Sequence, residues 1–225
     1  MTDIRAYRVN RGTGVSKGAF ADVLATARGA LSVNTLDALV ERWTADGRVF
    51  QSATPAMGTP ETMSAAGTAF TLTAPALHMT IPSGLTVVPI MIKVAGASVT
   101  VKRNLFAVMT GDTDSFTSGG EAMQAARNML TESATAYRTT SVTNLVHSDT
   151  AIVEAALTRP RVLTTAIQNP VNLEANFEYN ILKGDPFTVV TGPGVLVAYV
   201  VQETTAMEAT WTMTWAELDT AEYSA

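Results

Sequence analysis

Two stretches of strict alternation between apolar and polar side chains constrain the fold of this chain more than any other feature. Residues 171–181 alternate Val, Leu, Ala, Phe, Tyr and Ile with Asn and Glu, and residues 209–215 alternate Ala, Trp, Met and Trp with Thr. A period of two puts all apolar side chains on one face of a strand, whereas a helix would scatter them around its circumference. Both stretches are therefore predicted to be strands, with Trp211 and Trp215 in the core.

Shorter alternating runs and turn signals extend this pattern along the chain. Alternation recurs at residues 70–81 and 99–102, and turns rich in Gly and Pro separate the runs at residues 82–84, 184–186 and 192–194. One-sided patterning is typical of antiparallel sheets, and about eight to ten strands are expected. Pro89 interrupts the apolar run 87–92 and cannot donate to a ladder, so that strand is predicted to lie at an edge or to be bulged there.

Two segments have helical spacing. Leu36, Leu39, Val40 and Trp43 follow the i, i+3, i+4, i+7 pattern, which predicts a helix over residues 35–45 that ends at Gly47. Residues 121–130 are also helical in pattern, and an inserted loop across the top of the sandwich is the alternative. We therefore divide the chain into an N-terminal arm with a short helix (1–46) and an all-β, antiparallel two-sheet sandwich domain (47–225).

Composition excludes several classes of protein. The 225 residues include no cysteine, so neither a disulfide framework nor a thiolate metal site can form. Only 16% of residues are charged, and such a surface suits a protein whose faces are covered by neighbouring molecules. The N-terminus lacks the apolar stretch of a secretory signal, and no apolar run approaches the roughly 20 residues of a membrane-spanning helix, so no membrane span is expected.

The residues that could carry chemistry are few. His78 and His147 are the only histidines, whereas a zinc site normally needs two or three with carboxylates nearby. His78 stands at a polar position of an alternating run, which predicts a solvated or interface histidine. His147 precedes Ser148 and Asp149, but no G-x-S-x-G elbow accompanies them. The glycine-rich segment 12–18 matches neither a Walker A loop nor a dinucleotide fingerprint. We expect no enzymatic activity and no cofactor.

Two charged segments have a plain interpretation and a functional one. Asp112 and Asp114 lie on a tight loop and are calcium candidates, with Glu121 as the only nearby distal acid; a polar loop is the plainer interpretation. The N-terminal arm is basic and carries the candidates for nucleic-acid contact: Arg5, Arg8, Arg11 and Lys17. These side chains would contact phosphates without sequence preference, cap the acidic surface of a neighbouring subunit, or lie in solvent.

Four stretches carry a resemblance to a known class of protein. They are residues 36–50 (ending ADGRVF), 81–90 (IPSGLTVVPI), 192–201 (GPGVLVAYVV) and 211–218 (WTMTWAEL). Their order resembles jelly-roll virion structural proteins, especially the coat proteins of bacteriophages. The resemblance implies an eight-stranded jelly roll, symmetric self-assembly, no catalysis, and a location in the virion after assembly in the host cytoplasm.

The leading hypothesis is therefore a coat protein that assembles with other copies of itself through trimeric or hexamer-like units. Other virion proteins are further expected partners. An accessory virion protein, such as a decoration, spike or receptor-binding trimer, is the first alternative. A carbohydrate-binding β-sandwich module is the second, and it would need several exposed aromatic side chains on one concave face.

Overall fold

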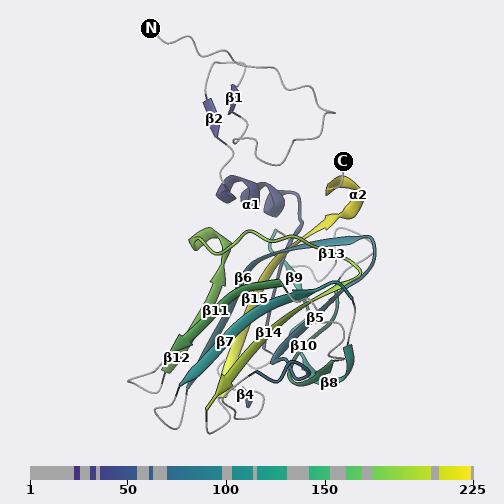
Figure 1. Cartoon of the computed structure of the whole chain (residues 1–225). Helices are drawn as coiled ribbons and strands as arrows, with labels where there is room; N and C mark the ends of the chain where they lie inside the picture. The colour runs from purple at the N-terminus through teal and green to yellow at the C-terminus, as the bar shows by residue number, and fades with distance from the viewer. Residues whose placement is uncertain are drawn as a thin grey trace.

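The chain adopts a two-layer β-sandwich, in which two antiparallel sheets pack face to face (Figure 1). The computed structural model describes residues 23–25, 31–33, 36–54, 61–62, 70–97, 103–113, 116–130, 142–152, 161–168, 174–203 and 208–223. A separate two-stranded sheet near the N-terminus pairs β1 (Val23–Ala25) with β2 (Leu31–Val33). The predicted all-β antiparallel architecture is confirmed.

The larger sheet has seven strands among the described residues. Its main path runs in the order β12-β6-β15-β3-β9, while β13 pairs with β6 and β4 pairs with β15. The strands are β3 (Val49–Ala53), β4 (Glu61–Thr62), β6 (Leu85–Ala97), β9 (Arg127–Asn128), β12 (Glu174–Asn180), β13 (Val190–Thr191) and β15 (Glu208–Asp219).

The smaller sheet has six described strands in the order β11-β7-β14-β5-β10-β8. Every pairing between neighbours is antiparallel. The strands are β5 (Leu77–Ile81), β7 (Asn104–Gly111), β8 (Phe116–Ala122), β10 (Thr143–Ile152), β11 (Arg161–Gln168) and β14 (Gly194–Gln202).

The two strands predicted from strict alternation are confirmed. In β15, Ala209, Trp211, Met213 and Trp215 are at most 1% exposed, as expected for the inward face of a sheet. In β12, Phe177 and Tyr179 are buried and Asn176 is exposed. Residues 171–173 of the predicted strand lie outside the described residues. The two tryptophans belong to the core between the sheets, as predicted.

A second apolar layer covers the outer face of the six-stranded sheet. We call it the outer cluster; it comprises Ala107, Met109, Val195, Val197 and Tyr199. Phe70 and Leu72 pack on it from the preceding segment, and the Tyr199 hydroxyl donates a hydrogen bond to the carbonyl oxygen of Leu72 at 2.8 Å. Residues 70–76 therefore shield part of this face from water.

Pro89 lies at a bulge in a central strand. The register between β15 and β6 shifts there, because Thr214 faces Met91 while Trp215 faces Pro89. On the other side of β6, the β12 ladder ends at Met91 and the β13 ladder begins at Val87, so Pro89 falls between two ladders. The predicted bulge is confirmed. The alternative of an edge position is wrong, because β6 has partner strands on both sides. The missing N–H of Pro89 is tolerated because it falls at the bulge and between the β12 and β13 ladders.

One of the two predicted helices is present. Helix α1 (Leu36–Ala45) matches the prediction, and Gly47 follows it with a φ of +69°, the left-handed conformation that favours glycine after a helix. Leu36, Leu39 and Val40 pack against the core, and Trp43 is buried in it. A second short helix, α2 (Thr220–Tyr223), follows β15, and a 3-10 turn, η2 (Ile181–Lys183), follows β12.

The helix predicted over residues 121–130 is wrong. This segment contains the end of β8, an extended stretch and β9, and it runs along β3. The amide of Gln124 donates to the carbonyl oxygen of Ala53, and the amide of Met129 donates to that of Val49, each at 2.8 Å. These amides pair with a neighbouring strand, so they are not available for hydrogen bonds within a helix.

In the described part of the chain, neither helix is long and apolar enough to cross a membrane. The division into an arm (1–46) and a sandwich (47–225) stays a prediction, since only two three-residue strands are described before Leu36.

Candidate functional site

The two histidines lie on opposite faces of the six-stranded sheet. His78 of β5 faces Val197 of the outer cluster, whereas His147 of β10 faces Leu77 of the core between the sheets. Directly opposed residues of an antiparallel pair share a face, so the two imidazoles point away from each other. They therefore do not form a common metal or catalytic site.

The expectation of a solvated His78 is wrong, because its side chain is fully buried. The ring of Phe116 lies 5.2 Å from the His78 ring, and Nδ1 of His78 lies 3.2 Å from the carbonyl oxygen of Asn144. Asn144 has a positive φ of 46° and sits at a register shift in β10. His78 thus contacts its neighbouring strand at an irregular point of the ladder.

His147 is also buried. Burial lowers the pKa of its imidazole, because the charged form loses hydration, and the nearby Glu121 carboxylate raises it by a smaller amount. The described residues include no group of three or more His, Asp or Glu side chains that could hold a metal ion. Glu121, which is exposed, stands opposite His147 in the register of β8 and β10.

The calcium and nucleic-acid candidates remain predictions. Asp112 is exposed in the turn after β7, and Asp114 lies outside the described residues. Glu121 is on β8, opposite His147 of β10, and its negative charge raises the pKa of the His147 imidazole. The basic candidates Arg5, Arg8, Arg11 and Lys17 all lie outside the described residues.

A hollow of about 550 Å³ lies beside α1, near the end of β15. Its two arginines share one acidic partner, since Asp46 Oδ2 lies 3.9 Å from Nε of Arg42 and 4.0 Å from Nε of Arg48. The remainder of the lining is apolar, and the full lining is Leu39, Arg42, Trp43, Asp46, Arg48, Phe187 and Leu218. Because its single carboxylate is paired with cations, this hollow lacks a free base or nucleophile.

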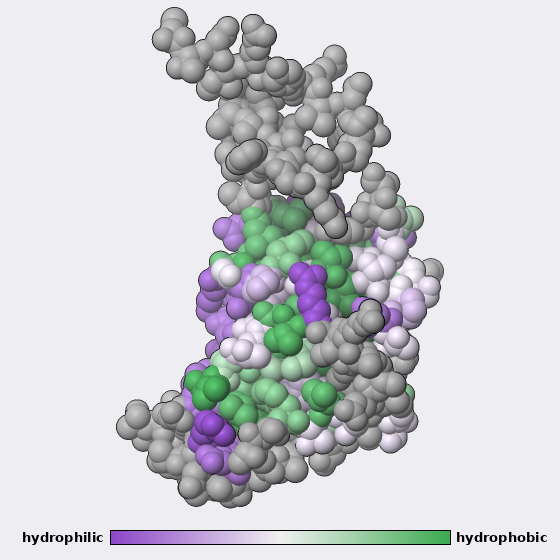
Figure 2. Space-filling model, viewed as in Figure 1, coloured by the Kyte–Doolittle hydropathy of each residue, from purple (hydrophilic) through white to green (hydrophobic). Residues whose placement is uncertain are grey.

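The most unusual surface is the free margin of the six-stranded sheet at β11. This strand pairs with β7 on one side, and no described strand pairs with its other side. Val162 and Ile167 on β11 are 49% and 64% exposed, although both are large and apolar. Figure 2 shows apolar surface over the face where Figure 1 places β7 and β11. A margin of this kind is a ready template for another strand.

Sequence reasoning missed β11. Its alternation is broken by a register shift between Val162 and Thr164, so no regular period of two is visible. The available signal was composition, since residues 161–168 (RVLTTAIQ) are rich in β-branched side chains and contain neither Gly nor Pro. No family model matches the sequence, and no curated protein matches it either.

Proposed function

We propose that this chain is a virion coat protein of the bacteriophage type, whose jelly-roll sandwich assembles with other copies of itself into a symmetric shell. The observation that carries the proposal is the strand order. Eight strands form the body of the sandwich, in the chain order β3, β5, β6, β7, β11, β12, β14 and β15. The pair β8 and β10 extends one sheet beyond β5, and β9 extends the other beyond β3.

Numbered one to eight along the chain, these strands form one sheet in the order 1-8-3-6 and another in the order 2-7-4-5. The first strand therefore pairs with the eighth, the second with the seventh, the third with the sixth and the fourth with the fifth. Such nested pairing is what a long antiparallel ribbon gives when it rolls into a sandwich with two Greek keys. It supports the jelly-roll assignment.

Jelly rolls are found in viral capsids, lectins and cupins, so the fold alone does not distinguish these functions, and the side chains present must be considered. A cupin-type metal centre needs clustered histidines, and the two histidines of this chain face opposite sides of a sheet. A sugar-binding platform needs exposed aromatic side chains. Among the aromatic residues whose exposure is described, Phe187 is the most exposed, at 39%. The separated histidines and the few exposed aromatic side chains in the described part of the chain both favour a structural role.

The surface also supports assembly. Few charges are available to keep the sandwich apart from its neighbours, since only 16% of residues are charged. Exposed apolar side chains occur on β11, after β9 and around η2, where neighbouring subunits would cover them; they are Val162, Ile167, Met129, Leu130, Leu182 and Phe187. Closed symmetric assembly from one repeated set of contacts is the ordinary outcome for such a protein.

Light scattering after size-exclusion chromatography tests the proposal at the level of the capsomer. The 225-residue chain is expected to elute as trimeric or hexamer-like units that grow into larger particles as concentration rises. A protein that stays monomeric at every concentration would contradict self-assembly. Small oligomers that never grow, but bind to preformed shells, would favour the accessory virion protein instead.

A further inference from the structure

The β11 edge, which we define as the side of residues 161–168 that faces away from β7, is regular over most of its length. After the register shift near Leu163, residues 164–168 pair one to one with residues 104–108 of β7. An edge strand of this kind carries a row of N–H and C=O groups that another strand can use. Arg161 is its only charged residue.

Three other margins of the two large sheets, at β8, β9 and β12, are protected. On β8, Gly119 and Gly120 have positive φ values of 80° and 77°, and the pairing with β10 shifts register twice. At the opposite end of the larger sheet, β9 is only two residues long. Bends and short strands are ordinary ways in which proteins prevent pairing between sheet edges.

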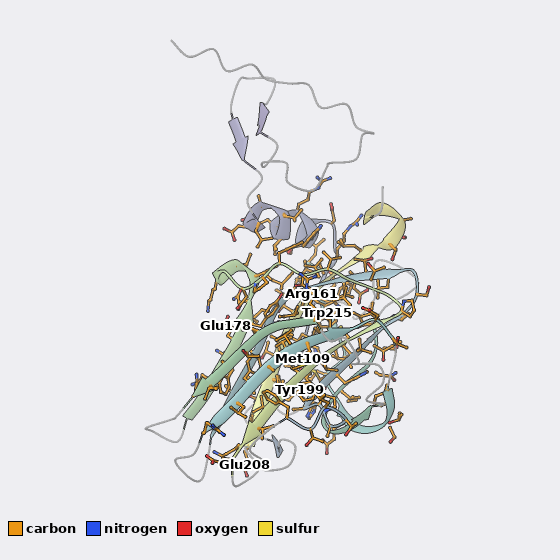
Figure 3. All side chains as sticks on the ribbon, in the orientation of Figure 1. Met109, Arg161, Glu178, Tyr199, Glu208 and Trp215 are labelled. Carbon is orange, nitrogen blue, oxygen red and sulfur yellow. The ribbon has the colours of Figure 1, made fainter. Side chains whose placement is uncertain are left out.

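The margin at β12 is protected by a charged pair and by a side chain of β11. Glu178 Oε2 is paired with Nζ of Lys183 at 2.5 Å. The carbonyl oxygen of Asn176 accepts a hydrogen bond from Nε2 of Gln168 at 2.6 Å, and the N–H of Asn176 donates to Oε1 of Gln168 at 3.2 Å, so these backbone groups are not available to another strand. Figure 3 places Glu178 at the margin of the sandwich, and Figure 2 shows hydrophilic surface there.

We propose that the β11 edge pairs with the β11 edge of a second copy of this chain, antiparallel and about a two-fold axis at Ala166. The register follows from the bulge: only an axis at Ala166 uses all five regular residues, 164–168, in both copies. This axis places Thr165 opposite Ile167 of the partner copy. Both side chains lie on the outer face, since they oppose Ala107 and Leu105 of β7.

A second copy suits this edge better than a charged peptide would. About an axis at Ala166, the two Arg161 side chains stand ten residues apart along the paired strands, roughly 33 Å, so they do not repel each other. No other charge falls within the five paired residues. The contact is isologous, with the same residues contributed by each copy, and it closes as a dimer instead of growing into a fibre.

This contact rests on the proposed function, because it supplies one of the symmetric contacts of a shell. The absence of cysteine makes it testable by cross-linking. Opposed residues of an antiparallel pair have Cα atoms roughly 4.5–5.5 Å apart, within the range that a disulfide spans. Under mild oxidation, Ala166→Cys is therefore expected to give a covalent dimer, while Ser118→Cys on the exposed margin of β8 is expected to stay uncross-linked.

A second variant tests the contact without relying on the cysteine. Ile167→Lys places a charge on an already exposed position, and it brings the two new ammonium groups of a dimer onto diagonal positions roughly 7 Å apart. The dissociation constant of the dimer, measured by analytical ultracentrifugation, is expected to rise at least tenfold. Ser118→Lys is the matched control and is expected to leave it unchanged. Circular dichroism checks that each variant folds.

The outcomes separate this contact from the proposed function. Particles that form normally from Ile167→Lys, with no dimer from Ala166→Cys, would overturn the β11 contact and leave the coat protein assignment standing. Self-association of Ile167→Lys at the unaltered dissociation constant overturns the contact even if some cross-link forms. A monomeric parent chain contradicts both proposals.

Discussion

Nε1 of Trp215 donates a hydrogen bond to Oε1 of Glu217 at 3.1 Å, and both side chains are fully buried. The two residues lie on the same face of β15, because they are two positions apart. The amide of Val142 approaches the same carboxylate oxygen at 3.5 Å. Glu217 therefore serves as a buried acceptor that fixes the orientation of a large core side chain.

Removal of this acceptor is expected to destabilise the fold. Glu217→Ala leaves the indole N–H without its partner and opens a cavity, which should lower the free energy of unfolding by about 2–4 kcal/mol. Glu217→Gln keeps an acceptor oxygen in place and should cost less than about 1 kcal/mol. Urea unfolding followed by tryptophan fluorescence measures both values. Equal losses for the two variants would show that the hydrogen bond contributes little.

Stability should depend on the protonation of His147. Burial lowers the pKa of this imidazole below its ordinary value of 6.5, so the unfolded chain binds the proton more readily than the folded one. The contribution of His147 to stability is complete above pH 6.5 and is lost as the pH falls toward its folded pKa.

Unfolding free energies measured between about pH 5.5 and pH 7.5 test this linkage, since most carboxylates stay ionised over that range. The parent protein is expected to lose stability below pH 6.5, and His147→Gln is expected to show a flatter profile. Identical slopes for the two proteins would contradict the assignment.

Gly192 is predicted to tolerate no side chain. A Cβ atom at this position would lie 1.9 Å from the carbonyl oxygen of Pro82, and the backbone would have to move. Gly192→Ala is therefore expected to cost more than about 3 kcal/mol or to prevent folding. Gly84→Ala is the control, because its Cβ meets open space and only its positive φ of 83° opposes the change, at about 1 kcal/mol. Thermal unfolding compares the two, and a similar loss in both would exclude the close approach.

Two buried tyrosines hold separate surface segments. The hydroxyl of Tyr199 donates to the carbonyl oxygen of Leu72, and that of Tyr179 donates to the carbonyl oxygen of Pro186, both at 2.8 Å. Burial raises the pKa of Tyr179 to about 12, and it raises that of Tyr199 as well. Neither phenol should therefore ionise below pH 10.

Each Tyr→Phe variant should cost about 1 kcal/mol and loosen only its own segment. Amide hydrogen exchange is expected to rise around residues 70–76 in Tyr199→Phe and around residues 185–188 in Tyr179→Phe. Each variant is the control for the other, and exchange that rises in both segments for either variant would point to a general loss of stability.

The basic N-terminal residues provide a test of nucleic-acid contact. If Arg5, Arg8, Arg11 and Lys17 bind phosphates, their combined replacement by Ala should reduce the slope of log affinity against log salt by about 3 for single-stranded nucleic acid. Filter binding at several salt concentrations measures this slope. An unchanged slope would assign these side chains to a neighbouring subunit or to solvent.

The sequence predicts those elements whose pattern is local and complete. Trp211 and Trp215 fall on one face of a strand by alternation alone, and Leu36 to Trp43 fall on one face of a helix. The missing N–H of Pro89 is a local property of the sequence, and it predicted either a bulge or an edge position. The central place of the strand depends on partners that are distant in sequence, so the local pattern could not choose between the two.

The elements that the sequence did not predict share a physical cause. Which residues cover a side chain, and which strand pairs with a segment, is decided by parts of the chain that are distant in sequence. Alternation correctly put His78 on the outer face of its strand, but the ring that buries it belongs to Phe116. The helical spacing of residues 121–130 was overruled because β3 accepts hydrogen bonds from Gln124 and Met129. The β11 edge was invisible because a bulge interrupts its period, and its exposure follows from the strand order.

Electron microscopy of the purified 225-residue chain at several ionic strengths tests the central claim most directly. Self-assembly through a repeated set of contacts predicts closed particles of uniform diameter in at least one of these conditions. Fields that contain only isolated monomers at every ionic strength, at concentrations where the protein is folded, would contradict the coat protein assignment.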